Sequence, residues 1–425
     1  MAYGDGTLKK VKPGVWRVYV YLGNDPITGK PIRPSRIVHG SKADARTARD
    51  AIRAEYESGL SVDGIKMTFG EFADTWHGSR VAAGEIVKSH LDREASMMRT
   101  LKRYIGDVRL RDITPQMVES LYAAIKADKL EGGGRCSGAT LHMHHALLKQ
   151  MLRKAVDYDL ILRNPCDRVK APKSDDPERR ALSAYEAARF LRCVDALEES
   201  AYAEMQEKET RQTERGNLFG RSLLYGLNVV SYAVALRIAL ATGMRRGEVF
   251  GLRWGCVDLD GSLIHVRQSL TVYGDAKKPK SRAGNRSIAI DAVTVARLRT
   301  WRTRQAAELL KLGIKQGDAT PVCCSATGGY VELHRFTRWW QVWRADNGFP
   351  DLKFHELRHT QATQLLANGV DVKTVQTRLG HSTAALTLDL YAHAVPGNDR
   401  KAAEIVGRLC AEGDGETRIL KVKTA

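Results

Sequence analysis

The stretch FHELRHT at residues 354–360 places His355 and Arg358 three positions apart. Side chains at this spacing share one face of an α-helix, so the pattern predicts that both point toward one site. The chain around them is strongly basic, with a formal net charge of +18 over 425 residues and a pI near 9.6. Such a charge indicates a polyanionic partner, and nucleic acid is the first candidate.

Other stretches of the chain contain a further arginine, a further histidine and a tyrosine. TGMRRGE at residues 242–248 contains Arg245. LGHS and TLDLYAH, which lie between residues 379 and 393, contain His381 and Tyr391. The chain therefore carries two arginines, two histidines and a phenol in a fixed order.

This set matches the chemistry of phosphodiester cleavage through a covalent tyrosine intermediate. A free phenol with a pKa of ~10 is mostly protonated at neutral pH, so the nucleophile needs activation. Arginine suits the charge that builds on the non-bridging oxygens, because its planar fork grips two of them and stays protonated. The departing 5′-oxygen needs a proton from a positioned acid. No metal and no cofactor is required by this scheme.

Each residue also has an ordinary structural interpretation. Arg245 could form a surface ion pair, His355 could cap a helix and Tyr391 could be a core aromatic. Taken one at a time, these interpretations outweigh catalysis. The ordered set on a basic chain favours catalysis, with Glu248, three residues after Arg245, placed to orient its guanidinium.

Composition narrows the class of protein further. The N-terminus lacks the apolar core of a signal peptide and no run of eighteen apolar residues occurs, so no membrane span is expected. Seven cysteines without a C-x-x-C pair are typical of a reducing cytoplasm and argue against structural zinc. His142, His144 and His145 invite a metal interpretation, but no carboxylate or cysteine joins them, so no metal is predicted there.

The order of strand, turn and helix signals along the sequence predicts a multidomain chain. It begins with a small basic sheet and one helix, over residues 1–60. Alternating residues indicate a strand over 14–22 and a second strand over 32–38. A helix capped by Ser41 is expected from residue 42 to about 58, followed by a linker.

Residues 67–170 are predicted to form a helical domain. Thr68 and Glu71 have capping-box spacing at its first helix. Further helices are expected near residues 88–104, 114–128 and 137–158, and a polar linker with two prolines follows at 170–178.

A larger α+β domain, mainly α, is predicted over residues 177–410, with a tail over 411–425. Strands are expected near 256–260, 262–269 and 286–290, and helices near 229–241, 291–312, 332–346, 355–368, 371–379 and 383–393. A charged insertion lies between Leu191 and Val229. Its acidic residues make direct DNA contact unfavourable, which leaves a protein contact or a solvated helix.

With these motifs in place, the chain resembles the tyrosine recombinases, the phage-integrase family. The matching segments are ATGMRRGE with GLRW at residues 241–254, FHELRHT at 354–360, LGHS at 379–382 and TLDLYAH at 387–393. The resemblance is strong over 177–410, moderate over 67–170 and weak over 1–60. It implies an arm-type DNA-binding domain over 1–60, a helical, SAM-like core-binding domain over 67–170 and a catalytic domain over 177–410.

The resemblance also assigns roles. Tyr391 would be the nucleophile that forms a 3′-phosphotyrosyl link, and Arg245 and Arg358 would clamp the scissile phosphate. His355 and His381 would assist proton transfer and phosphate binding.

The family's strand-hairpin lysine, which protonates the 5′-oxygen, matches Lys280 in KPKSRAGNR at residues 278–286. Its neighbours Lys277 and Lys278 are the alternatives. His359 also follows the family pattern, where packing against its helix is the expected role.

A site-specific integrase that inserts and excises a mobile element is the function that the resemblance implies. It would act as a homotetramer on double-stranded DNA attachment sites in the cytoplasm of a bacterial host, associated with the nucleoid when bound to DNA. A host DNA-bending or directionality factor is a further expected partner, and the tail would dock on a neighbouring protomer.

Two other functions compete with this one. A type IB topoisomerase shares the catalytic residues but relaxes DNA without joining two partners, and the separate N-terminal sheet argues against it. A DNA-binding protein or decayed integrase without turnover is the second alternative, and the occupied catalytic positions argue against it.

Overall fold

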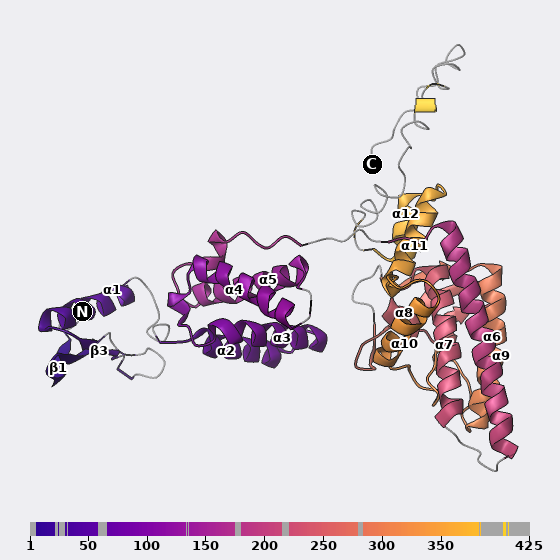
Figure 1. Ribbon diagram of the computed structural model, residues 1–425, viewed down its shortest axis with the longest axis horizontal. Coiled ribbons are helices and arrows are strands. Elements are labelled where there is room, and N and C mark those ends of the chain that lie inside the picture. The colour runs from indigo at the N-terminus through magenta and orange to yellow at the C-terminus, as the bar shows by residue number, and fades with distance from the viewer. Residues whose placement is uncertain are drawn as a thin grey trace. The chain divides into compact units, whose positions relative to one another are not determined.

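The computed structural model describes residues 6–21, 24, 30–31, 33–57, 66–132, 134, 136–174, 180–214, 221–278, 284–381, 383, 403–404 and 407, the side chains of 55–57, 208–214 and 221–225 excepted. The chain divides into two compact units, residues 1–177 and 178–425 (Figure 1). The predicted helix near 383–393 and the tail over 411–425 lie outside the described residues. No helix among the described residues is long and apolar enough to cross a membrane.

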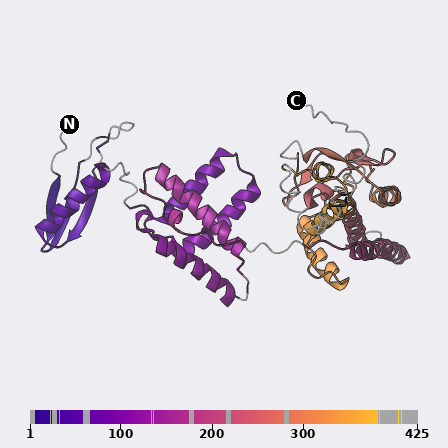
Figure 2. The same cartoon turned by 90° about the horizontal axis from the view of Figure 1, so that it is seen from above.

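The first unit begins with a three-stranded antiparallel sheet and one helix. The strands β1 (Thr7–Lys12), β2 (Val15–Tyr19) and β3 (Ser35–His39) pair in that order. Helix α1 (Lys42–Glu57) crosses one face of this sheet (Figure 2), and a small core of Val18, Val20, Ala45 and Ile52 is buried. The Ser41 hydroxyl accepts from the Asp44 amide at 3.3 Å, so the predicted helix start is confirmed.

Strand β1 was not predicted from the sequence. Five of its six residues are exposed and TLKKVK has no apolar alternation, so its pairing with β2 decides its conformation. Its lysines suit an edge strand, because charged side chains discourage pairing with another chain.

Among the described residues, the rest of the first unit consists of four α-helices and two 3-10 helices, at Leu110–Asp112 and Pro165–Arg168. The α-helices are α2 (Phe69–Ala83), α3 (Lys88–Ile105), α4 (Pro115–Glu131) and α5 (Gly138–Asp157). They enclose a separate core that includes Phe69, Leu101 and Leu148. The predicted capping box is present, since the Thr68 hydroxyl accepts from the Glu71 amide and the Glu71 carboxylate accepts from the Thr68 amide. The predicted all-helical pattern between residues 67 and 170 is confirmed.

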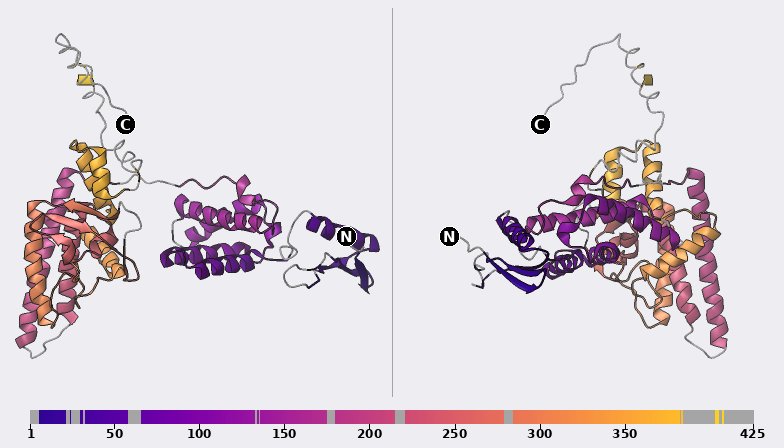
Figure 3. Two further views of the ribbon diagram at one scale, coloured as in Figure 1. Left: turned by 180° about the vertical axis from the view of Figure 1, so that it is seen from behind. Right: turned by 60° about the vertical axis from the view of Figure 1, so that its left-hand side comes forward.

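Three long helices support the second unit: α6 (Ala184–Glu214), α7 (Arg221–Thr242) and α9 (Ala292–Lys311). They run alongside one another in each view (Figures 1 and 3). One continuous hydrophobic core joins them to the remaining elements, and Trp254, Trp301 and Phe250 are among its largest buried side chains.

The remaining described elements of this unit are two small sheets, four α-helices and one 3-10 helix at Trp254–Cys256. Strands β4 (Val257–Asp258), β5 (Leu263–Val266) and β8 (Arg286–Ala289) form one antiparallel sheet, and β6 (Ser269–Leu270) pairs with β7 (Ala276–Lys277). The helices are α8 (Arg246–Phe250), α10 (Leu333–Asp346), α11 (Phe354–Ala367) and α12 (Val372–Leu379). The predicted α+β, mainly helical class is confirmed.

The described residues of the charged insertion belong to the C-terminal part of α6 and the first turns of α7. The helix expected near 229–241 already begins at Arg221. Two of the acidic side chains are bound within the unit. Glu198 is 1% exposed and lies 3.7 Å from the Arg237 guanidinium, and Glu199 pairs with two arginines of α9. Ion pairs therefore fasten the described part of the insertion to its own domain.

We predict that Arg237→Met destabilises the second unit by about 3–5 kcal/mol, because it removes the buried guanidinium that pairs with both Asp195 and Glu198. The double variant Arg237→Met, Glu198→Leu should recover most of this loss, and urea unfolding measures both. Arg299→Met, which breaks an exposed pair with Asp260, is the control and should cost less than about 1 kcal/mol. Equal losses for the single and double variants would contradict the buried pairing.

Candidate active site

The turn between α7 and α8 places Arg245. Gly243 has a φ of 64°, in the left-handed region, and a Cβ at this position would collide with the side chains of Gln361 and Leu379. A glycine is therefore needed for the chain to turn sharply where α11 and α12 approach it. Arg245 lies directly before the first residue of α8, and 44% of its side chain is exposed.

Glu248 holds Arg245 in place. Its carboxylate accepts from the Arg245 side chain and from the Arg245 backbone amide, both at 2.9 Å. The same carboxylate accepts two hydrogen bonds from Arg286, at 2.9 and 3.2 Å. Although burial alone would raise it, these contacts hold the pKa of Glu248 below its usual value. The carboxylate is therefore ionised at neutral pH.

Arg358 approaches the same turn from α11. Its Nη1 donates to the Gly243 carbonyl at 2.8 Å. Its Nη2 is buried and has no hydrogen-bond partner among the residues that the structure describes. Burial and the nearby Arg245 lower the pKa of Arg358 to about 9, which leaves the guanidinium charged at neutral pH. One strong donor is therefore available for an anion.

His355 lies one turn before Arg358 on the same helix and is exposed. Its ring packs edge-on against His359, with centroids 4.9 Å apart. His359 itself is buried, which agrees with a packing role.

The C-terminal end of α12 brings His381 to the cluster. Gly380 ends the helix in the left-handed conformation, and its carbonyl accepts from Arg245 Nη2 at 3.2 Å. Arg378 anchors the same helix end by donating to the Ala241 carbonyl at 2.9 Å. Burial, followed by the charges of Arg358 and Arg245, lowers the pKa of His381 to about 4. The imidazole is therefore neutral at pH 7.

The structure thus brings Arg245, Glu248, Arg358 and His381 together around this turn, although Arg245 and His381 lie 136 residues apart in the sequence. Two guanidiniums, one of them with an unused buried donor, make a site for an anion such as a phosphate. Lys280 and Tyr391 lie outside the described residues, so their placement here stays a prediction.

Three residues of this network were not predicted from the sequence. Arg286, Arg378 and Gln361 all donate to the turn, to Glu248 or to the end of α12. Arg286 belongs to the segment in which Lys280 was recognised, but nothing in that segment indicates a buried arginine facing Glu248. Only the packing of β8 against α12 and the α7–α8 turn reveals it.

The histidines of α5 have hydrogen-bond partners within the helical domain. His144 and His145 are buried, and the His145 ring lies 2.8 Å from the Tyr122 hydroxyl. Within the described residues, no group of three or more histidine, cysteine or acidic side chains is arranged to hold a metal ion.

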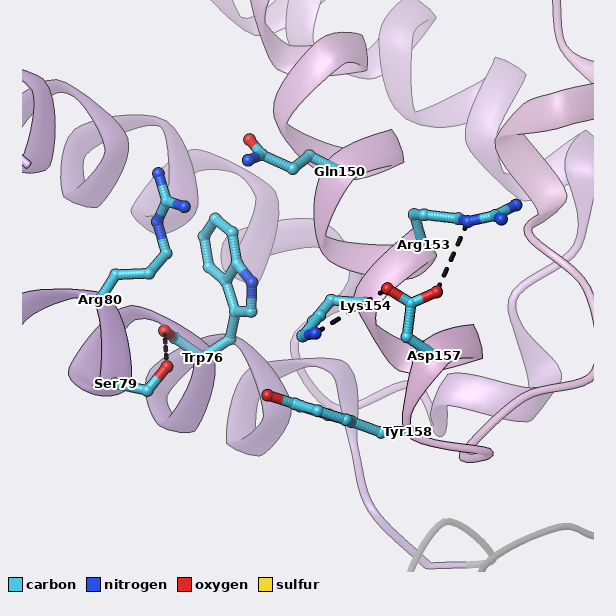
Figure 4. Close-up of a pocket in the computed structure, with 8 residues that line it drawn as sticks. All are labelled: Trp76, Ser79, Arg80, Gln150, Arg153, Lys154, Asp157 and Tyr158. Carbon is cyan, nitrogen blue, oxygen red and sulfur yellow. Dashed lines mark hydrogen bonds and ion pairs between the residues drawn. The ribbon is translucent and has the colours of Figure 1, made fainter. Parts of the chain in front are cut away.

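A pocket of about 330 Å³ lies in the helical domain, between α2 and α5 (Figure 4). Arg80 sits over the Trp76 ring on one side, and Arg153 and Lys154 lie on the other. Two carboxylates offset two of these three positive charges, since the buried Glu94 accepts two hydrogen bonds from Arg80, and Asp157 pairs with both Arg153 and Lys154. The pocket therefore attracts an anion less strongly than the cluster around Arg358 does.

The fold is that of a multidomain protein in which two arginines and a histidine lie close together in the second unit. Residues 224–397 match the phage integrase family domain, and residues 69–171 match the phage integrase SAM-like domain. The chain belongs to the phage integrase family, the tyrosine-type site-specific recombinases. A topoisomerase and a DNA-binding protein without catalysis are not favoured by these findings.

Similar proteins span nearly the whole chain. A tyrosine recombinase XerC-like protein of Caldanaerobacter subterraneus is 24% identical, covering 93% of this chain and 96% of that protein. The ICEBs1 integrase of Bacillus subtilis is 21% identical, covering 94% and 98%. Among solved structures, the Tn1549 transposon integrase bound to transposon right end DNA has a TM-score of 0.59 at 20% identity, covering 80% of this chain and 100% of that one. A lambda integrase dimer bound to a core site has a TM-score of 0.52 at 20% identity, covering 90% and 94%.

We predict that Arg245→Gln raises the pKa of His381 from about 4 toward its ordinary value of ~6.5, because removing a nearby positive charge favours the protonated imidazole. Burial and Arg358 remain, so the rise should be partial. An NMR titration of the histidine ring protons measures it, with the His381 signal assigned from a His381→Gln variant. Arg299→Gln, an exposed change on α9, should leave the titration unaltered. An unchanged pKa in Arg245→Gln would show that the charge of Arg245 does not contribute to it.

Proposed function

We propose that this recombinase cleaves and rejoins double-stranded DNA at attachment sites to integrate and excise a mobile element. The observation that carries the proposal is the buried Nη2 of Arg358, a charged donor without a partner among the described residues, beside Arg245 and His381. A buried donor is costly to leave unpaired, so this arrangement is best explained by a ligand that completes it. A phosphodiester in DNA supplies the required oxygens and charge.

Arg245 and Arg358 would hold the two non-bridging oxygens of the scissile phosphate. Both guanidiniums are fixed before DNA binds, Arg245 by Glu248 and Arg358 by the Gly243 carbonyl. Fixed donors stabilise the charge of the transition state without rearranging, and losing one costs on the order of 10² to 10³ in rate.

His381 would respond to the phosphate. Its pKa is low in the free protein because the ring is buried and two guanidiniums lie near it. A bound phosphate offsets their charge and raises this pKa, so that the ring gains a proton or donates a stronger hydrogen bond to a phosphate oxygen. His355, exposed on the same side of α11 as Arg358, would assist proton transfer.

The chemical step needs Tyr391 and Lys280. The Tyr391 oxygen attacks phosphorus while the bond to the 5′-oxygen breaks, the phenolic proton passes to a neighbouring base and Lys280 protonates the departing oxygen. The 3′-phosphotyrosyl link keeps the energy of the broken bond. Attack by a 5′-hydroxyl of a second duplex then reverses each transfer and restores a phosphodiester, so no nucleotide hydrolysis is required.

Recombination between two duplexes suggests four copies of the chain. A lambda integrase tetramer bound to a Holliday junction has a TM-score of 0.51 to this chain, and we propose the same stoichiometry here. The helical domain would bind the core site and the N-terminal sheet a distal arm site. A host DNA-bending or directionality factor would join this complex. Light scattering of the DNA-bound protein tests for four copies.

Tyr391→Phe tests the reaction, because it removes only the nucleophilic oxygen. Wild-type protein is incubated with a pool of nicked duplexes of random central sequence, and DNA that becomes covalently attached is recovered under SDS and sequenced. The recovered duplex then serves as the substrate. We expect the adduct to disappear in Tyr391→Phe while DNA affinity remains.

Tyr273→Phe is the matched control, since this exposed tyrosine of the same domain lies in a turn between β6 and β7. It should form the adduct at the wild-type rate. An adduct that persists in Tyr391→Phe would move the nucleophile elsewhere, and no adduct with the wild-type protein would refute the proposed function.

Removing residues 1–60 tests the domain roles. Lys9, Lys10 and Arg17 are exposed on the N-terminal sheet, so the deletion should abolish the footprint at a distal site and leave the core-site footprint unchanged. The intact protein should also lose affinity more steeply with salt than the deletion, because each neutralised phosphate releases about 0.9 counterion from duplex DNA. Identical footprints and salt slopes would contradict an arm-binding role.

A further inference from the structure

Arg286 is a buried arginine at the start of β8, with 4% of its side chain exposed. Its guanidinium makes hydrogen bonds in two directions. Two of its nitrogens donate to the Glu248 carboxylate, at 2.9 and 3.2 Å. Its Nε donates to the Arg378 carbonyl at 2.7 Å. The side chain therefore joins the α7–α8 turn to the last turn of α12.

These contacts complete a ring of hydrogen bonds. Glu248 accepts from both Arg245 and Arg286. Arg245 then donates to the Gly380 carbonyl, two residues beyond the carbonyl that Arg286 holds. Consequently the position of the Arg245 guanidinium relative to His381 depends on a side chain that reaches neither the exposed part of the site nor the solvent.

Charge gives the ring a second consequence. A carboxylate paired with Arg245 alone would cancel its charge, and the site would attract a phosphate less. Because Glu248 divides its hydrogen bonds between two guanidiniums, the group of three keeps a net charge of +1. The buried charge of Arg286 also keeps Glu248 ionised, and only an ionised carboxylate accepts from both arginines.

We propose that Arg286 is a positioning residue for Arg245, acting through Glu248 and the end of α12 without touching the DNA. This inference rests on the proposed function, in which Arg245 binds the scissile phosphate. Substitution of Arg286 should slow cleavage of the phosphodiester in the way that substitution of Arg245 does. Both changes weaken the stabilisation of charge on the two non-bridging oxygens of the scissile phosphate.

Arg286→Lys is the test variant. It keeps a buried positive charge beside Glu248, but one ammonium cannot reproduce the planar fork that spans Glu248 and the Arg378 carbonyl. Arg299→Lys is the matched control, since Arg299 forms an exposed ion pair with Asp260 on the same domain. If thermal unfolding shows that Arg286→Lys does not fold, the double variant Arg286→Met, Glu248→Gln replaces it, because it removes both buried charges together.

Three substrates separate the routes by which Arg286 could act. Each is the duplex recovered by covalent capture, with an ordinary phosphate, a methylphosphonate or a bridging 5′-sulphur at the cleaved position. A methylphosphonate lacks one charged oxygen and depends less on an arginine clamp. A thiolate leaves without a proton donor, so the sulphur substrate rescues loss of a general acid. Arg245→Ala and Lys280→Ala serve as the references for these two behaviours.

We expect Arg286→Lys to form the adduct about 10- to 100-fold more slowly than wild type on the ordinary phosphate, since small misplacements of a catalytic group cost up to about 10². The deficit should shrink by about tenfold on the methylphosphonate, as for Arg245→Ala, and should persist with sulphur, unlike that of Lys280→Ala. DNA affinity and the Arg299→Lys rates should match wild type.

An equal deficit on all three substrates would reduce Arg286 to a structural role and overturn the proposal. Rescue by sulphur alone would also overturn it, by placing the effect at the lysine hairpin, and so would a wild-type rate on the ordinary phosphate. Failure of the wild-type protein to form any adduct is a separate result, because it refutes the proposed function before the Arg286 variants are compared.

Discussion

The structure of the site depends on one buried carboxylate. Glu248 is 5% exposed, yet it stays ionised because two arginines and a backbone amide donate to it. A buried charge is tolerated only with such partners. The geometry that satisfies Glu248 also fixes the guanidinium of Arg245, so the stability of this small region and the arrangement of the site have the same physical origin.

The turn at residues 241–245 is the second element of this design. Its carbonyl groups accept from side chains that arrive from elsewhere in the chain: Gln361 and Arg378 at Ala241, and Arg358 at Gly243. A turn built on a left-handed glycine leaves these oxygens without helical partners, and cationic and amide donors replace them. The same contacts bring α11 and α12 close to Arg245. The donors that satisfy these carbonyl groups therefore also gather positive charge around the turn.

The long helices of the second unit support the turn that carries Arg245. The extended α6 is held to α7 by the buried pair of Arg237 and Glu198, and to α9 by the partly exposed pairs of Glu199 with Arg297 and Arg304. Since α7 ends at Thr242, directly before the turn, this support sets the direction in which the turn leaves the core. The acidic side chains of the insertion thus contribute to the scaffold of a basic protein.

The sequence by itself determined the class of the protein and most of its helices. The motifs around Arg245, Arg358 and His381 carry their chemistry in short segments, and caps such as Thr68 and Ser41 mark helix starts through local hydrogen bonds. The tertiary structure alone decided the conformation of β1, the pairing of Glu198 and the position of Arg286, because each depends on partners far away in the chain. Periodicity reports which face of an element is buried. It does not report which buried charge meets which, and that is settled only when helices and strands pack together.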